Sequence, residues 1–315
     1  MSIPFGSGSV CLLAPSGAFG SSQSIRGKLS HYLPPSCVRK RRMIIAAVVQ
    51  MTSTSDEEGN WRSARELIGR AAAAGAGFVA TPECTNYLGP HAEKVRRAER
   101  LGERTTERFA ALAKELKIHL LLGSYNERSE GASPFPPKKC ANTSVLFSPE
   151  GKILKSYRKI HMFDVDIPGG VKFSESETCE SGGEVVVAKT PFGKLGLSIC
   201  YDLRFPELYR VMTQQGAEIH MVPSAFTLAT GKDHWEPLLR ARAIETQSYV
   251  LAPAQYGKHD DDGLKESWGH SMIVDPWGQV IASVSDGVGF ALAEIDLERV
   301  RRIRRAIPVA KHRRL

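Results

Sequence analysis

The residue with the clearest chemical context is Cys200, which ends an apolar run and precedes a helix start. Leu195–Cys200 is predicted to be a strand, and Pro206 is typical of the first turn of a helix. A strand, a sharp turn and a helix in this order lift a nucleophile out of a sheet. The helix N-terminus favours the thiolate, and the N–H of Tyr201 is positioned to bind an oxyanion. The alternative is that Cys200 is a small buried hydrophobic residue.

A cysteine nucleophile needs a base and a group that stabilises negative charge, and two other segments offer candidates. Glu83 follows Pro82 at the end of a predicted strand, where a carboxylate can face a pocket at the edge of a sheet. Lys159 comes directly after the strand-like segment Ile153–Arg158. Taken alone, Glu83 is also typical of a solvated loop acid and Lys159 of a surface lysine.

Three segments together resemble a known family. Pro82–Glu83, Tyr157–Lys159 and Cys200–Glu207 are similar in sequence and order to the Glu–Lys–Cys signature of the carbon–nitrogen hydrolase (nitrilase/amidase) superfamily. The resemblance covers residues 43–315. It implies that Glu83 is the general base and acid, that Lys159 stabilises the oxyanion and the intermediate, and that Cys200 is the nucleophile.

The same resemblance implies an auxiliary residue, a fold and an assembly. Glu175 matches a second glutamate in the loop after the lysine. The fold is expected to be a four-layer α-β-β-α sandwich of two mixed sheets with outer helices, which forms a homodimer or a higher homo-oligomer through its helices.

Further segments resemble the Nit branch of this superfamily. They are Pro223–Phe226, Thr230–Glu236, Arg240–Glu245, Ala254–Gln255 and Gly269–Gly278. Two departures bear on the pocket: Pro253 interrupts a stretch that is small and apolar in the relatives, and Asp260–Gly263 forms an unusually acidic loop.

The resemblance implies a small amide substrate, glutathione whose α-amine is replaced by a keto group, with 2-oxoglutarate and cysteinylglycine as products. The carboxylates of this substrate call for a cation. Arg204 is a candidate, although it is equally placed to pair with Asp202 or Glu207; Tyr87 and Thr227 are further pocket candidates. An ω-amidase acting on 2-oxoglutaramate, a nitrilase, a carbamoylase and a non-catalytic interaction module remain alternatives.

The elements that must position these residues alternate along the chain. A β-α-β-α-β opening predicts an α/β layered architecture, and no linker divides residues 43–315, which we expect to form one domain. The predicted helices are Trp61–Ala71, Phe109–Leu116 and Trp235–Thr246. The predicted strands are Ile44–Gln50, Phe78–Thr81, His119–Tyr125, Thr143–Phe147, Ile153–Tyr157, Glu184–Lys189, Leu195–Cys200, Ile219–Pro223, Tyr249–Ala254, Ser271–Val274, Val280–Val284 and Phe290–Ile295.

The net charge of +8 comes mostly from the first 42 residues. This leader carries six basic and no acidic residues and is rich in serine, which is typical of a transit peptide. We expect a cleaved leader over residues 1–42, plastid rather than mitochondrial; a disordered tail is the alternative, with a cytoplasmic location. Residues 43–315 hold 36 basic against 34 acidic residues, so no nucleic-acid partner is expected. The arginine-rich segment 299–314 is expected to be solvated.

The six cysteines form no C-x-x-C pair, so the sequence indicates neither a zinc ribbon nor a thioredoxin-like site. No nucleotide or flavin motif is present, and we expect no cofactor. No apolar run approaches the ~18 residues of a membrane-spanning helix, so no membrane partner is expected.

Overall fold

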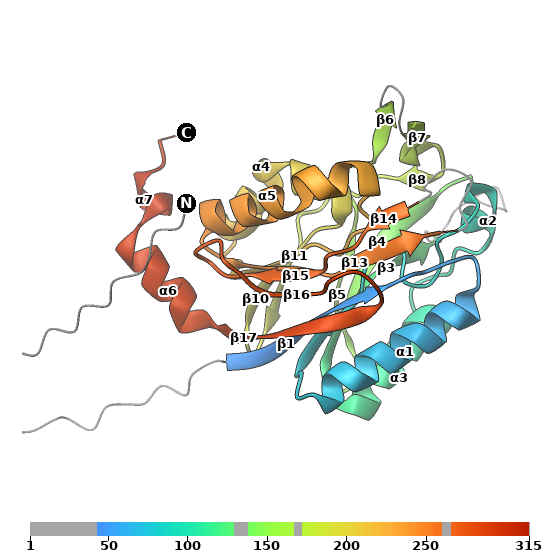
Figure 1. Ribbon diagram of the computed structural model, residues 1–315, viewed down its shortest axis with the longest axis horizontal. Coiled ribbons are helices and arrows are strands. Elements are labelled where there is room, and N and C mark those ends of the chain that lie inside the picture. The colour runs from blue at the N-terminus through green and yellow to red at the C-terminus, as the bar shows by residue number, and fades with distance from the viewer. Residues whose placement is uncertain (1–42, 129–137, 167–171, 260–265, 315) are drawn as a thin grey trace, which may run out of the picture. The chain divides into compact units, whose positions relative to one another are not determined.

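The computed structural model describes residues 43–128, 138–166, 172–259 and 266–314. The predicted leader and the acidic loop at residues 260–263 lie outside these described residues. Within them, two β-sheets lie face to face and helices cover their outer faces (Figure 1). The predicted four-layer α-β-β-α sandwich is confirmed.

The first sheet has β1 near its centre and carries two of the predicted functional segments. β1 pairs in parallel with β2 and β13 and antiparallel with β17. Its described strands are β1 (Met43–Met51), β2 (Phe78–Ala80), β3 (His119–Glu127), β4 (Cys140–Phe147), β5 (Ile153–Arg158), β8 (Cys179–Glu180), β13 (Ala254–Lys258), β14 (Glu266–Trp268) and β17 (Gly289–Asp296).

The second sheet carries the Cys200 segment. The three strands β10, β11 and β12 run in parallel; β9 and β15 flank them in the opposite direction, and β16 pairs antiparallel with β15. Its described strands are β9 (Val187–Thr190), β10 (Gly193–Leu197), β11 (Ile219–Met221), β12 (Tyr249–Ala252), β15 (Met272–Val274) and β16 (Val280–Ser283). A separate hairpin joins β6 (Asp164–Asp166) to β7 (Lys172–Ser174).

Alternation along β1 explains the layers, because successive side chains of a strand point to opposite faces. Ala46 and Val48 belong to the core between the sheets, and Ala47 and Val49 to the core beneath the outer helices. The described helices are α1 (Glu57–Ala73), α2 (His91–Arg96), α3 (Arg104–Leu116), α4 (Pro206–Gln214), α5 (Leu228–Thr246), α6 (Leu297–Ala306) and α7 (Val309–His312), with 3₁₀ turns η1 (Glu175–Glu177) and η2 (Cys200–Arg204). α1 and α3 pack on the first sheet, and α4 and α5 lie on the second (Figure 1).

One predicted strand was wrong. The segment Tyr249–Ala254 is two strands in two different sheets, β12 and β13, separated at Pro253. Proline has no N–H for a sheet ladder, and its carbonyl accepts from the Ser224 amide at 3.0 Å. The chain therefore crosses between the layers at this residue.

Other boundaries also differ from prediction, and two of them bear on the site. The Leu195–Cys200 strand ends at Leu197, so Cys200 begins a 3₁₀ turn. The helix predicted from Trp235 begins at Leu228 and continues through Pro237. Fully buried Trp235 donates to the His270 carbonyl at 2.9 Å, and this tertiary contact stabilises the turns before the proline.

The C-terminal arginines are not uniformly solvated. Arg304 donates to the carbonyls of Ala217 and Gln247, and Arg299 pairs with the buried carboxylate of Asp275. These arginines attach α6 to the second sheet. No helix in the described residues is long and apolar enough to cross a membrane.

Candidate active site

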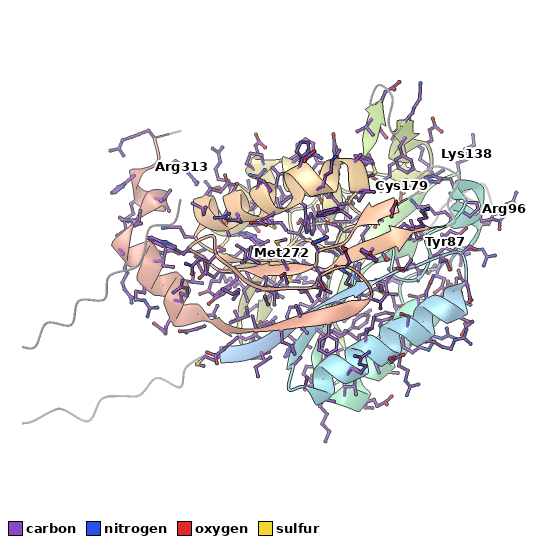
Figure 2. All side chains as sticks on the ribbon, viewed as in Figure 1. Tyr87, Arg96, Lys138, Cys179, Met272 and Arg313 are labelled. Atoms are coloured by element: carbon purple, nitrogen blue, oxygen red, sulfur yellow. The ribbon has the colours of Figure 1, made fainter. Side chains whose placement is uncertain are left out.

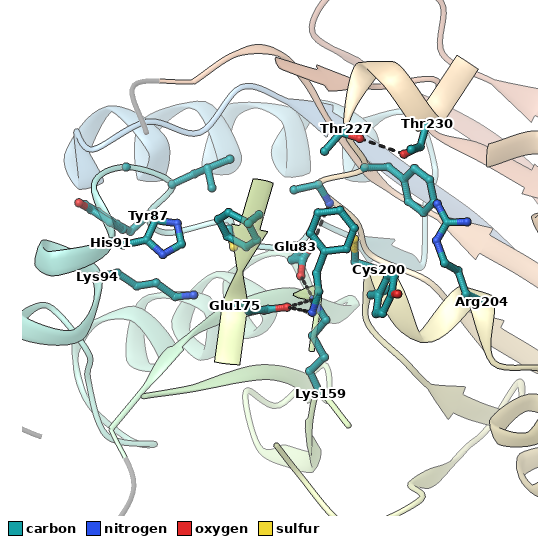
Figure 3. Close-up of a pocket in the computed structure, with 18 residues that line it drawn as sticks. Glu83, Tyr87, His91, Lys94, Lys159, Glu175, Cys200, Arg204, Thr227 and Thr230 are labelled. Carbon is teal, nitrogen blue, oxygen red and sulfur yellow. Dashed lines mark hydrogen bonds and ion pairs between the residues drawn. The ribbon is translucent and has the colours of Figure 1, made fainter. Parts of the chain in front are cut away.

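Three strand ends meet at the candidate site. β2 is parallel to β3, and β5 is also parallel to β3 because both run antiparallel to β4. The carboxyl ends of β2 and β5, which lead into Glu83 and Lys159, therefore share one edge of the first sheet. Cys200 follows β10 of the facing sheet, and all three residues line one pocket (Figure 3).

Cys200 occupies a tight turn. Its φ of +47° lies in the left-handed region, which non-glycine residues adopt at a cost of about 1–3 kcal/mol. Its N–H donates to the Pro223 carbonyl at 2.9 Å, and the Asp202 carboxylate accepts from the Ile199 N–H at 2.9 Å. The strand therefore ends abruptly, and the turn presents the sulfur to the pocket.

Asp202 anchors this turn to the first sheet. Although fully buried, it accepts from the Tyr157 hydroxyl at 2.7 Å and from the His161 N–H at 3.1 Å. Tyr157 and His161 flank Lys159 in the sequence, so one carboxylate ties the nucleophile turn to the lysine segment.

Lys159 is held between two carboxylates. Its ammonium lies 2.9 Å from Glu83 Oε1 and 2.8 Å from Glu175 Oε2, and all three side chains are at most 5% exposed. Burial would lower the pKa of Lys159, but the charges of Glu175 and Glu83 raise it well above its ordinary value. An ammonium has three N–H donors, so the third is available to a ligand in the pocket.

Glu83 is oriented by neutral donors as well. The Ala225 N–H donates to its Oε2 and the Asn142 amide to its Oε1, each at 2.8 Å. The Asn142 amide also lies 3.2 Å from Glu175 Oε1 and so bridges the two carboxylates. Gln255 donates to the Glu83 backbone carbonyl at 2.8 Å. These contacts fix the carboxylate against the sulfur.

The electrostatics correct one expectation. Burial is the largest cause that raises the pKa of Cys200 well above its ordinary value; the charge of Glu83 and a hydrogen bond to it act in the same direction, and Lys159 opposes them. The net direction differs from the expected thiolate, because burial and Glu83 together outweigh the groups that favour the anion. The resting sulfur is therefore a thiol, and Glu83 is the neighbouring group that can accept its proton.

The pKa of Glu175 is shifted in the opposite direction to that of Cys200. Burial raises its pKa, but the charges of Lys159 and Lys94 outweigh burial and bring the pKa to about 2. Glu175 also accepts from the Phe163 N–H at 2.8 Å. It is therefore a permanent counter-ion that holds Lys159 in place.

The pocket has a volume of about 640 Å³, including its open mouth, and contains the predicted Tyr87, Arg204 and Thr227. Figure 2 shows Tyr87 at the end of the molecule that lies farthest from α6 and α7. Arg204 does not pair with Asp202 or Glu207 within the described residues. Its guanidinium instead lies over the Phe226 ring, 5.1 Å from the centroid, with Nη1 and Nη2 each 3.4 Å from His234 Nδ1; these long contacts leave N–H groups that can meet a ligand.

Tyr201 lies at the pocket wall, with its ring 5.1 Å from that of Phe163.

Sequence reasoning missed Asn142, Lys94 and the Ala225 amide. A polar Asn142 inside the buried strand β4 was a usable signal, because buried polar side chains require partners. A backbone amide leaves no such signal. Among the described residues, no group of three or more His, Cys, Asp or Glu is arranged to hold a metal ion.

Comparisons with known proteins agree with this geometry. The sequence profile of the carbon-nitrogen hydrolase family matches residues 45–305. The chain belongs to this family, and it is a hydrolase that acts on carbon–nitrogen bonds other than peptide bonds.

Several relatives are similar over most of the chain. The deaminated glutathione amidase of Homo sapiens is 44% identical over 86% of this chain and 82% of its own length. The protein of the same name from Synechocystis sp. is 42% identical over 85% of this chain and 97% of its own length. The crystal structure of the C. elegans NitFhit protein superposes with a TM-score of 0.80 and 42% identity, over 86% of this chain and 65% of that one.

Proposed function

We propose that this protein hydrolyses deaminated glutathione to 2-oxoglutarate and cysteinylglycine through a thioester on Cys200, as a metabolite-repair reaction. The observation that carries the proposal is the meeting of Cys200, Glu83 and Lys159 in one pocket, with Glu83 hydrogen-bonded to both the thiol and the ammonium. The names of the similar human and Synechocystis proteins support the substrate.

The acylation step begins when the Cys200 sulfur attacks the amide carbonyl carbon and its proton passes to Glu83. The new S–C bond leaves an oxyanion, to which the third N–H of Lys159 and the Tyr201 N–H donate. Donors of this kind contribute about 3–4 kcal/mol each in a dry pocket. The C–N bond then breaks, and Glu83 returns the proton to the departing amine.

The deacylation step uses the same groups. Glu83 takes a proton from water, and the resulting hydroxide attacks the thioester carbon. The C–S bond breaks and the sulfur regains the proton. Two moderate barriers replace one high barrier, which is the advantage of covalent catalysis.

Arg204 is proposed to bind the 2-oxo acid end of the substrate. It lies four residues after Cys200 in the turn η2, so its distance from the sulfur is set by local structure. Its planar guanidinium suits a carboxylate. Tyr87 and Thr227 belong to the same pocket and complete the proposed substrate contacts.

A side-by-side assay tests the substrate. We expect wild-type protein to release cysteinylglycine from deaminated glutathione with a higher kcat/KM than it releases ammonia from 2-oxoglutaramate. Cys200→Ala should abolish both reactions without changing the thermal unfolding midpoint. A higher kcat/KM for 2-oxoglutaramate would favour an ω-amidase, and wild-type turnover in Cys200→Ala would overturn the mechanism.

Two assignments remain proposals from the sequence. The acid-free leader is proposed to direct the protein to an organelle, a plastid in preference to a mitochondrion, and to be cleaved near residue 42. The protein is proposed to act as a homodimer or a higher homo-oligomer. Import of a leader-fused reporter and light scattering of residues 43–315 would test these two proposals.

A further inference from the structure

Lys94 is a second buried lysine in the pocket wall, and the proposed mechanism does not use it. It lies on α2, is 8% exposed and lines the pocket together with Cys200 and Arg204. A lysine this deeply buried is uncommon unless it is paired. The groups that contact its ammonium therefore show whether the charge serves the fold alone or can also bind a ligand.

The fold pairs Lys94 with a single sulfur. Within the described part of the chain, the ammonium makes one hydrogen bond, to Cys179 Sγ at 2.9 Å, and no carboxylate lies within ion-pairing distance. Lys159, by contrast, is held by two carboxylates. An ammonium has three N–H donors, and this contact uses one of them, so two remain to meet a ligand in the pocket.

Lys94 nevertheless carries its charge. Burial lowers its pKa, but the charges of Cys179, the larger cause, and Glu175 outweigh burial and raise the pKa well above its ordinary value. Cys140 and Cys179 are register partners on β4 and β8 behind this side chain. Cys179 therefore keeps a charged ammonium at the pocket while it occupies one of the three N–H donors.

The position of Lys94 complements that of Arg204. Figure 3 shows Lys94 on one side of Glu83 and Cys200, and Arg204 on the other side. The two cations come from different layers, α2 beside the first sheet and η2 after the second. A substrate whose scissile amide is at Cys200 would thus have the Lys94 ammonium on one side and the Arg204 guanidinium on the other.

We propose that Lys94 binds the terminal carboxylate of the leaving group, the glycine carboxylate of cysteinylglycine, and so selects a substrate with an anion on each side of the scissile amide. The inference rests on the proposed function. The acyl part of the substrate, which carries the 2-oxo acid, is short. Its carboxylate therefore suits Arg204, which is close to Cys200 in the chain. The longer dipeptide end suits the more distant α2 wall.

A comparison of matched substrates tests Lys94. Deaminated glutathione and its glycinamide analogue differ only in the terminal charge. We expect wild-type kcat/KM to favour the carboxylate by about 10- to 100-fold, the range of one charge-assisted hydrogen bond. In Lys94→Met the ratio should fall to about one, mainly through KM. The KM for 2-oxoglutaramate, which lacks the dipeptide, should rise less than the KM for deaminated glutathione.

The controls separate binding from folding. A ratio of two substrates in one preparation is independent of the folded fraction, and Lys94→Arg should keep most of the preference for the carboxylate. Lys114→Met removes an exposed charge on α3 and should leave the ratio unchanged. An unchanged ratio in Lys94→Met, or equal losses on all three substrates, would overturn the assignment of Lys94. Absence of deaminated glutathione turnover by wild type would instead contradict the proposed function.

Discussion

Glu83 and Lys159 form a buried ion pair, with 2.9 Å between Oε1 and Nζ, beside a cysteine whose pKa the same carboxylate raises. The pair separates the two tasks of the site. The carboxylate is ready to accept a proton, while the ammonium, held also by Glu175, is ready to meet an oxyanion.

Replacing Glu83 by Gln should increase the thiolate fraction of Cys200 and still decrease turnover. The pKa of Cys200 is raised by burial and then by Glu83, so loss of the Glu83 charge lowers this pKa and leaves Lys159 to stabilise the thiolate. Turnover should fall by about 10²–10⁴-fold because the proton carrier is lost. Iodoacetamide alkylation against pH, followed by mass spectrometry, should show the Cys200 profile shifted to lower pH. Glu115→Gln on the surface is the control; an unchanged profile with full turnover would exclude Glu83 as the base.

Replacing Asp202 by Asn should loosen the nucleophile turn. The carboxylate accepts from Tyr157, His161 and the Ile199 N–H, and an amide nitrogen would face at least one of these donors. The expected loss is about 2–4 kcal/mol of unfolding free energy, measured by urea denaturation. Asp166→Asn on the exposed hairpin should change it by less than about 0.5 kcal/mol. Equal stability of the two variants would show that the turn does not depend on this anchor.

Replacing Arg204 by Gln should raise KM for both deaminated glutathione and 2-oxoglutaramate, since both carry the 2-oxo acid. Loss of one bidentate carboxylate contact predicts a rise of about 10- to 100-fold with a smaller change in kcat. Arg204→Lys should restore only part of the affinity, because a point charge replaces a planar fork. A variant with normal KM on both substrates would remove Arg204 from the binding site.

Stability should depend on pH through Cys179. A hydrogen bond from Cys140 is the main cause that lowers the pKa of Cys179 to about 6, with help from Lys94 and against burial. In the unfolded chain the pKa is about 8.5. The folded-state pKa is the lower one, so the stabilisation is complete above about pH 8.5 and is lost as pH falls through about 6.

The comparison is wild type against Cys179→Ser, under reducing conditions. The difference in their unfolding free energies should shrink from pH 8.5 to pH 6, with a slope of at most about 1.4 kcal/mol per pH unit. A difference that stays flat over this window would show that Cys179 is not a thiolate in the folded protein.

The sequence was sufficient for the layers, because they follow from local patterns. The apolar run of β1 is a buried strand, and the helical spacing of Ala64, Leu67 and Ala71 gives the buried face of α1. Prediction failed at Tyr249–Ala254, where an apolar run continues through Pro253 while the chain changes sheet. The hydrophobicity of this segment indicates that the residues on both sides of Pro253 are buried, but it does not indicate to which sheet each side belongs.

The sequence by itself determined the α/β sandwich and the order of Glu83, Lys159 and Cys200, since residue type and periodicity are local properties. Only the tertiary structure decided that these residues share one pocket, that Asn142 and the Ala225 amide orient Glu83, and that Cys200 rests as a thiol. The physical reason is that a pKa and a hydrogen bond depend on burial and on residues far away in the chain. Glu83 and Ala225, for example, are separated by 142 positions. Such contacts exist only once the two sheets have packed together.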